Sequence, residues 1–196
     1  NSSYQEGKGL SREELYARMP QMQVTPTTAV PPAHEFAAAF RALAAQADEI
    51  VAITLASTLS GMYSVAELAA REVTELKVQV VDSLQVTMGL GWMVIAAAEA
   101  AAKGRSGGEI VRLVEEMKPR VRVYAVLDTL DFLRRSGRVS WARAKAGQLL
   151  RIKPIIEVFM GQVSNVGQTH TRKRALDQMV GLIQAAGKPE RLAIIH

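Results

Sequence analysis

A run of hydroxyl residues around one glycine, Ser57-Thr58-Leu59-Ser60-Gly61-Met62-Tyr63-Ser64, is the stretch of this sequence best suited to bind an anion. It follows a short apolar run, residues 50–55, and precedes residues 65–70, which are rich in helix formers. A strand, a Ser/Gly turn and a helix in this order point backbone N–H groups and hydroxyls at one spot. The first turn of a helix also carries the positive end of its dipole. Local chemistry therefore predicts an anion site, with phosphate as the obvious candidate.

Metal ligands are scarce in the sequence. The chain has no cysteine, which excludes disulfides, thiolate catalysis and cysteine-ligated metal sites. Its three histidines, His34, His170 and His196, never stand three or four residues apart, so we expect no metal site. Because the turn also lacks a phosphate-binding lysine, phosphate becomes the weaker candidate for the anion.

Three aspartates could in principle perform acid–base chemistry, but two of them have a simpler structural explanation. Asp82 and Asp128 end predicted strands and stand directly before Ser83 and Thr129, where aspartate commonly caps the next turn. Asp131 lies in a segment predicted to be helical. We therefore predict turn capping for Asp82 and Asp128, and we assign no catalytic residue.

Positive charge is concentrated in the second part of the chain, although the net charge is only +5. Residues 1–117 carry 9 Lys and Arg against 14 Asp and Glu, whereas residues 118–196 carry 15 against 5. Two basic clusters contribute, Arg134-Arg135-Ser136-Gly137-Arg138 and Arg172-Lys173-Arg174. A solvated surface, an acidic protein partner and a nucleic acid each fit these charges. The clusters lack the interleaved aromatic residues that are typical of nucleic-acid binding.

The first part of the chain alternates between strand and helix patterns. Residues 50–55 and 78–81 are short and rich in β-formers, and each run precedes a segment with helical spacing, residues 61–72 and 88–103. This order predicts a parallel sheet flanked by helices, with binding loops at the carboxyl ends of the strands. Both Ser57–Ser64 and Asp82-Ser83 occupy such ends.

The second part predicts another α/β unit. We expect its boundary near Pro119, where the charge balance changes sign, which gives domains of residues 1–118 and 119–196. The second domain is predicted to hold a mixed sheet. Its expected elements are strands at residues 120–127, 152–159, 163–171 and 192–195, and helices at residues 130–135, 142–150 and 172–186. A chain rarely ends on an apolar strand, so the sequence is expected to be part of a longer protein.

Two further motifs have structural explanations. Thr27-Thr28-Ala29-Val30-Pro31-Pro32 contains two prolines, which favour an extended loop before the next helix. Gly89-x-Gly91 lacks the full dinucleotide fingerprint and lies inside an apolar helix. These glycines are expected to permit close helix packing or the close approach of a ligand chain.

Composition is that of a globular protein, with 48% hydrophobic, 22% charged and 5% aromatic residues. Apolar runs are too short to span a membrane, and no signal segment is found. We expect a cytoplasmic protein.

Five motifs occur in an order that resembles the DegV family of bacterial fatty-acid-binding proteins. They are the 58–64 turn, Val80-Val81-Asp82-Ser83, Leu127–Arg138, Gly147–Ile155 and the Thr27–Pro32 loop. The resemblance implies two α/β domains with an acyl chain buried between or within them. It also implies an acyl carrier that is not itself an enzyme and that has no cofactor besides its bound long-chain fatty acid.

The resemblance further implies residue roles and a partner. The fatty-acid carboxylate would be held by Thr28, Ser60 and the Gly61 N–H, with Thr27, Ser57 and Met62 in support. A separate fatty acid kinase would then make acyl phosphate for phospholipid synthesis. The charge of Arg172-Lys173-Arg174, rather than the resemblance, makes this cluster the candidate for partner docking. The alternatives are a basic nucleic-acid-binding or regulatory module and a small phosphotransferase that uses the Ser57–Ser64 turn.

The sequence departs from the family pattern at three places. Ala29-Val30 replaces the usual Gln-Pro, and Met62 stands where threonine is usual. The family's opening strand with its Asp-Ser and its closing segment with a carboxylate-contacting histidine have no counterpart in this sequence, and His196 is not taken as the replacement.

Overall fold

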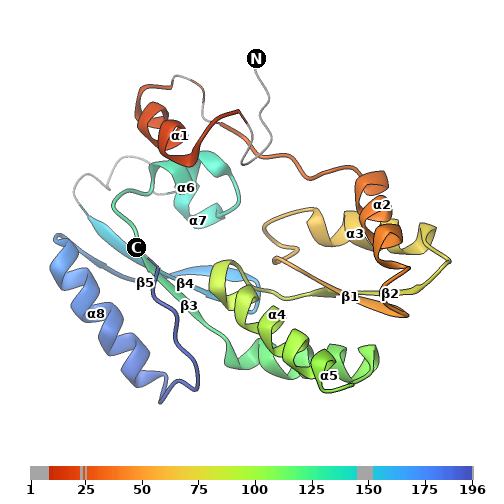
Figure 1. Cartoon of the computed structure of the whole chain (residues 1–196). Helices are drawn as coiled ribbons and strands as arrows, with labels where there is room; N and C mark the ends of the chain where they lie inside the picture. The colour runs from red at the N-terminus through yellow and green to blue at the C-terminus, as the bar shows by residue number, and fades with distance from the viewer. Residues whose placement is uncertain (1–8, 23, 25, 145–151, 196) are drawn as a thin grey trace.

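The computed structural model describes residues 9–22, 24, 26–144 and 152–195. These residues form an α/β chain with two sheets, as the sequence predicts (Figure 1). The elements that precede the first sheet are α1 (Arg12–Arg18), η1 (Met19–Gln21) and α2 (Ala33–Leu43). Helix α1 begins with a capping box formed by Ser11 and Glu14, a Ser-x-x-Glu pattern.

The first sheet pairs β1 (Glu49–Thr54) with β2 (Lys77–Asp82) in parallel, from Glu49 opposite Lys77 to Thr54 opposite Asp82. Four helices flank it. Helices α2 and α3 (Met62–Glu72) lie on one face, and α4 (Thr87–Ala102) and α5 (Gly107–Met117) lie on the other (Figure 1). The predicted parallel sheet between two helical layers is confirmed.

Side chains of β1 point alternately to the two faces of the sheet, and this explains why the layered unit has two cores. Ile50 and Ala52 point to the α2–α3 face, where they pack against a core that includes Phe40. Val51 and Ile53 point to the α4–α5 face, where Met93 is fully buried. Successive side chains of a strand face opposite sides, so a nearly continuous apolar run is what a strand buried on both faces requires.

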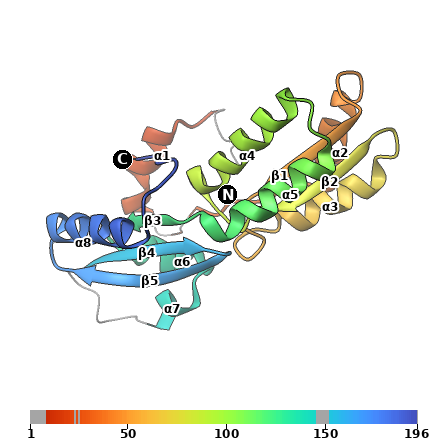
Figure 2. The same cartoon turned by 90° about the horizontal axis from the view of Figure 1, so that it is seen from below.

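The second sheet has the order β3-β4-β5, formed by Val123–Val126, Lys153–Phe159 and Gln162–Thr169. The strands are antiparallel, with a bulge between Ile155 and Ile156, whereas the sequence predicted a mixed sheet. Helix α8 (Arg172–Ala185) packs against all three strands (Figure 2). In chain order, η2 (Lys118–Arg120) precedes β3, and α6 (Asp131–Ser136) and α7 (Ser140–Ala144) follow it, before β4.

One segment differs from its prediction, and another is largely untested. The predicted strand at residues 192–195 is not formed, because no strand in the described part of the chain pairs with this segment, and Leu192, Ile194 and Ile195 stay exposed. Arg191 Nη2 donates to Glu99 Oε2 at 2.9 Å, and its guanidinium lies 5.6 Å from the Trp92 ring centroid. Most of the helix predicted at residues 142–150 lies outside the described residues. The division into domains at residues 118 and 119 stays a prediction.

Within the described part of the chain, no helix is both long and apolar enough to cross a membrane. The same residues contain no group of three or more histidine, aspartate and glutamate side chains placed to hold a metal ion.

Helix α5 supplies a first testable prediction. Ser106 caps its N-terminus, and the Ser106 N–H, the Arg105 guanidinium and the Ser106 hydroxyl together lower the pKa of Glu109 to about 2. A lowered folded-state pKa stabilises the fold above the ordinary value near 4.5, and this contribution is lost as the pH falls toward 2. Ser106→Ala removes only the hydroxyl and keeps the N–H, so the Glu109 pKa should rise part of the way toward its ordinary value in an NMR titration. Loss of the serine cap should cost about 1 kcal/mol of stability. A Glu109 pKa that stays near 2 in this variant would contradict the prediction.

Candidate functional site

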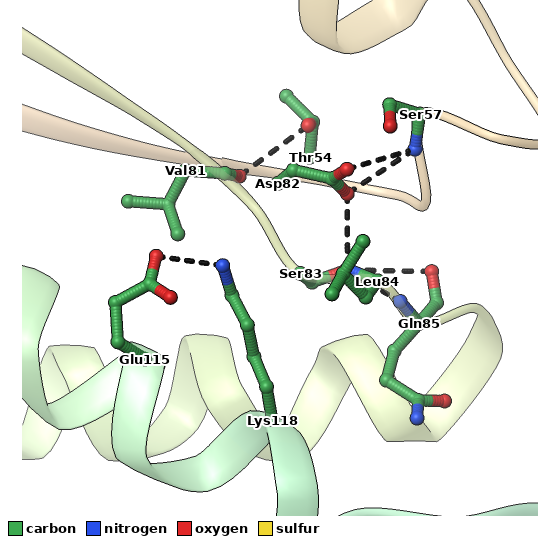
Figure 3. A network of polar contacts seen from close by, with 9 residues as sticks. All are labelled: Thr54, Ser57, Val81, Asp82, Ser83, Leu84, Gln85, Glu115 and Lys118. Atoms are coloured by element: carbon green, nitrogen blue, oxygen red, sulfur yellow. Dashed lines mark hydrogen bonds and ion pairs between the residues drawn. The ribbon is translucent and has the colours of Figure 1, made fainter. Parts of the chain in front are cut away.

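Asp82 joins the loops that follow the two parallel strands. Because β1 and β2 end at the same edge, Thr54 lies opposite Asp82 and both loops begin there. The Asp82 carboxylate accepts hydrogen bonds from Ser57 N at 3.1 and 3.2 Å and from Leu84 N at 2.9 Å (Figure 3). The predicted capping role of Asp82 is confirmed, and it extends to the hydroxyl-rich turn.

The Ser57–Ser64 segment is a tight turn that leads into a helix. Leu59 N and Ser60 N donate to the carbonyl of Ala56 at 3.0 and 3.2 Å, and Ala56 is fully buried. Ser60 Oγ accepts a hydrogen bond from Met62 N at 3.3 Å, at the first residue of α3. Gly61 is the N-cap of α3 and provides no side-chain cap. This is the strand–turn–helix arrangement that suits an anion.

The Thr27–Pro32 loop approaches the same turn. A Cβ on Gly61 would lie 4.0 Å from Val30 Cγ2, so Val30 packs beside the glycine. Thr27 and Thr28 are exposed. The structure therefore brings this loop to Gly61 through Val30, while the role of Thr28 as a carboxylate ligand stays a prediction.

Tyr63, in the first turn of α3, contributes a neutral phenol near the turn. Burial raises the pKa of its hydroxyl, and a hydrogen bond with Glu67 and the negative charges of Asp82 and Glu115 raise it further. The phenol therefore stays protonated at neutral pH and remains a hydrogen-bond donor.

Gln85 ties the strand-end loops to the second sheet, and the sequence analysis did not identify it. Its side chain is fully buried, and its Nε2 donates to the carbonyls of Val121 at 2.9 Å and Val158 at 3.5 Å. Its own carbonyl accepts from Ala56 N at 2.9 Å, and its N–H donates to Ser83 Oγ at 3.1 Å. The only sign of this role in the sequence is that Gln85 is a polar residue between the apolar residues Leu84 and Val86.

The turn between β4 and β5 reaches the same region from the other half of the chain. Thr58 Oγ1 donates a short hydrogen bond to the carbonyl of Gly161, and Gly161 N donates to the carbonyl of Leu84 at 2.8 Å. The hydroxyl-rich turn thus touches both the Asp82–Gln85 loop and the tip of the second sheet. This contact was not predicted either.

The Arg172-Lys173-Arg174 cluster lies at the start of α8, and part of its charge is already paired. Arg172 Nη1 lies 3.2 Å from Asp128 Oδ2, and Lys153 Nζ lies 3.0 Å from Asp128 Oδ1. Both cations lower the pKa of Asp128, and the effect of Lys153 is larger than that of Arg172. The prediction that Asp128 caps the next turn is not supported, because Thr129 Oγ1 accepts the Asp131 N–H and Asp128 binds the two cations.

A pocket of about 490 Å³ lies beside β1 on its α4–α5 face, within the size range of small-molecule sites. Val51 and Ile53 of β1 form one wall, and Asp48, Glu49 and Arg105 add polar groups. The remaining lining residues come from α4 and α5 and the turn before α5: Val94, Ala97, Ala98, Ala101, Gly107 and Ile110. The pocket therefore combines apolar and charged side chains, and it adjoins the strand that leads into the Ser57–Ser64 turn.

These features define a two-sheet α/β protein with hydroxyl-bearing loops at the carboxyl ends of its parallel strands, where such folds bind ligands. A sequence model of the family described as uncharacterised protein, DegV family, matches residues 1–196, and the chain belongs to the DegV family. The family predicted from the motifs is confirmed.

Two relatives illustrate the match in sequence. A DegV domain-containing protein of Deinococcus radiodurans is 39% identical over 173 residues, which cover 88% of this chain and 61% of the relative. Protein DegV of Bacillus subtilis is 33% identical over 198 residues, which cover 99% of this chain and 70% of the relative. Both relatives are longer than this chain.

Two solved structures match the fold. A DegV family protein of Thermus thermophilus, described by its fatty acid binding, superposes with a TM-score of 0.84 at 29% identity. DegV of Bacillus subtilis, described as a fatty acid binding protein, superposes with a TM-score of 0.81 at 32% identity. Each match covers 93% of this chain but 65% of the solved chain, which is less than two thirds of its length.

Proposed function

We propose that this protein binds a long-chain fatty acid, with its carboxylate at the turn that joins β1 to α3. The Ser60 hydroxyl, the Gly61 N–H and the Thr28 hydroxyl are the assigned ligands, with Thr27, Ser57 and Met62 in support. The observation that carries the proposal is the Ser60-Gly61 turn at the start of α3, held by Asp82 through Ser57. Fatty acid binding by two solved relatives of the same fold supports the choice of ligand.

The acyl tail and the carboxylate are expected to make different contributions to binding. Burying an acyl chain is worth about 0.8 kcal/mol per CH₂, or roughly 10 kcal/mol for a long chain before ordering costs. Affinity therefore comes mainly from the tail, and apolar side chains such as Val51, Ile53 and Val94 in the pocket beside β1 could contact it. The neutral donors at the turn supply orientation.

The role we propose is that of a carrier that is not itself an enzyme. A carboxylate held by hydroxyls and a backbone N–H stays reactive, whereas a buried arginine clamp would compete with phosphoryl transfer. A separate fatty acid kinase could then phosphorylate the presented carboxylate for phospholipid synthesis. We assign its docking to Arg172, Lys173 and Arg174, and this assignment rests on their charge and exposure.

Ser60→Ala tests the carboxylate site. Removing one hydrogen bond to a charged group costs about 1.5–3 kcal/mol, so the dissociation constant for palmitate should rise about tenfold or more. Thr28→Val should weaken binding in the same direction. Displacement of a fluorescent fatty acid measures both. Ser64→Ala is the matched control, because Ser64 is an exposed serine of the same segment and should leave affinity unchanged. Equal palmitate affinity for Ser60→Ala and wild type would contradict the assignment.

A further inference from the structure

The contact between Thr58 and the β4–β5 turn joins the proposed carboxylate site to the second sheet. Thr58 lies two residues before Ser60, within the turn closed by the Ala56 carbonyl. Its hydroxyl donates to the Gly161 carbonyl, and the Gly161 N–H donates to the Leu84 carbonyl. A movement of the 56–61 turn must therefore strain or break this contact.

The conformation of the contact is tightly specified. Leu84 and Met160 have φ values of 54° and 48°, in the left-handed region that is unfavourable for a non-glycine residue. Gly161 has φ 75°, and a Cβ there would lie 3.2 Å from Leu84 Cδ2 and 3.3 Å from Thr58 Oγ1. Unfavourable backbone conformations persist only where surrounding contacts hold them. We therefore expect the hairpin tip and the two strand-end loops to hold one another in place.

Strand β5 connects this tip to the basic cluster of α8. It begins at Gln162, directly after Gly161, and its eight residues span about 27 Å. At its other end Thr169 Oγ1 donates to the Thr171 carbonyl at 2.9 Å, and Thr171 caps α8, which begins at Arg172. Strand β4 pairs along β5 and carries Lys153, which shares Asp128 with Arg172. Apart from the bulge at Ile155 and Ile156, the paired strands thus form one hydrogen-bonded element between the two places.

We propose that Thr58 is a positioning residue that couples fatty-acid occupancy of the Ser57–Ser64 turn to the basic start of α8 through the β4–β5 hairpin. The inference rests on the proposed function. A carboxylate bound by Ser60 and Gly61 restrains the 56–61 turn, and the Thr58 hydroxyl passes that restraint to Gly161. Coupling between two sites is reciprocal, so a partner docked on Arg172-Lys173-Arg174 would also change fatty-acid affinity. A partner could then distinguish the loaded from the empty carrier.

Hydrogen–deuterium exchange on the full chain tests the coupling, with palmitate as the probe. In the wild type, palmitate should slow amide exchange across residues 160–175. Thr58→Val, which keeps the shape and removes the hydroxyl, should abolish the slowing and weaken palmitate binding about three- to tenfold. Thr58→Ser restores the hydroxyl and should rescue both. A merely structural role for Thr58 would change basal exchange and leave the palmitate-dependent difference intact.

The outcomes separate the inference from the function on which it rests. If wild type binds palmitate without slower exchange at residues 160–175, the coupling is overturned and the binding site stands. If palmitate slows exchange equally in wild type and Thr58→Val, Thr58 is not the link. If wild type does not bind palmitate, both proposals fall. The wild-type comparison needs no variant to fold, and exchange at residues 160–175 that palmitate leaves unchanged is enough to overturn the coupling.

Discussion

Asp82→Ala should lower the free energy of unfolding by about 2–3 kcal/mol, because hydrogen bonds to a charged group are worth about 1.5–3 kcal/mol. The substitution removes the acceptor for both Ser57 N and Leu84 N, which begin the two strand-end loops. For a chain of this size the midpoint of thermal unfolding should fall by roughly 4–12 °C. Palmitate affinity should fall at least tenfold, because the turn that carries Ser60 loses its anchor.

Asp82→Asn is the matched control for this prediction. Its amide keeps one acceptor oxygen and can serve one of the two N–H groups, so stability and affinity should lie between those of wild type and Asp82→Ala. Chemical denaturation and palmitate titration measure the two effects. Wild-type stability in Asp82→Ala would contradict the anchoring role, and a stability loss without any loss of affinity would separate Asp82 from the ligand site.

Gly89→Ala should destabilise the protein by about 1–2 kcal/mol, although alanine is normally favoured over glycine in a helix by about 0.5–1 kcal/mol. The added Cβ would lie 2.7 Å from Gln85 Oε1 and 2.8 Å from Val123 Cγ2. Overpacking of this kind costs about 1–3 kcal/mol. The clash also involves the buried side-chain amide of Gln85, which joins the strand-end loops to the second sheet. We therefore expect these loops to become more mobile as well.

Gly181→Ala provides the contrast within the same chain. Gly181 lies in α8, and a Cβ there would meet no atom within 4 Å, so alanine should stabilise the protein by about 0.5–1 kcal/mol. Urea unfolding of both variants gives the two values with opposite signs. A Gly89→Ala protein as stable as the wild type would mean that the helix shifts to accommodate the methyl group.

Local pattern determined much of what could be predicted. The apolar run before Ser57 and the helix formers after it specify β1 and α3, because strand burial and helix spacing are properties of neighbouring residues. The same holds for the capping box at Ser11 and for the Asp82 turn. Family motifs then selected fatty-acid carboxylate over phosphate, a choice that the local chemistry of the Ser57–Ser64 turn leaves open.

Contacts between distant segments could not be predicted in this way. Thr58 and Gly161 are 103 residues apart, and the acceptor is a main-chain carbonyl that has no signature in sequence. Gln85 likewise binds the carbonyls of Val121 and Val158. Asp128 resembled a turn cap because its neighbours favour one, but folding places two cations beside it. Tertiary proximity decided these three cases.

The second sheet shows the same limit at a larger scale. The β4–β5 hairpin is readable from Met160-Gly161, which adopts the left-handed conformations of a tight turn. The direction in which β3 pairs with β4 depends on the path of the chain between residues 126 and 153. No local pattern specifies that path.

Organic extraction of the purified protein, followed by mass spectrometry, tests the central claim most directly. Fatty-acid binding through a buried acyl chain predicts that a long-chain fatty acid co-purifies in roughly equimolar amount, since an apolar tail worth about 10 kcal/mol survives purification. Ser60→Ala protein prepared in parallel should retain less. Several independent preparations that release no fatty acid, from protein that also fails to take up added palmitate, would contradict the claim.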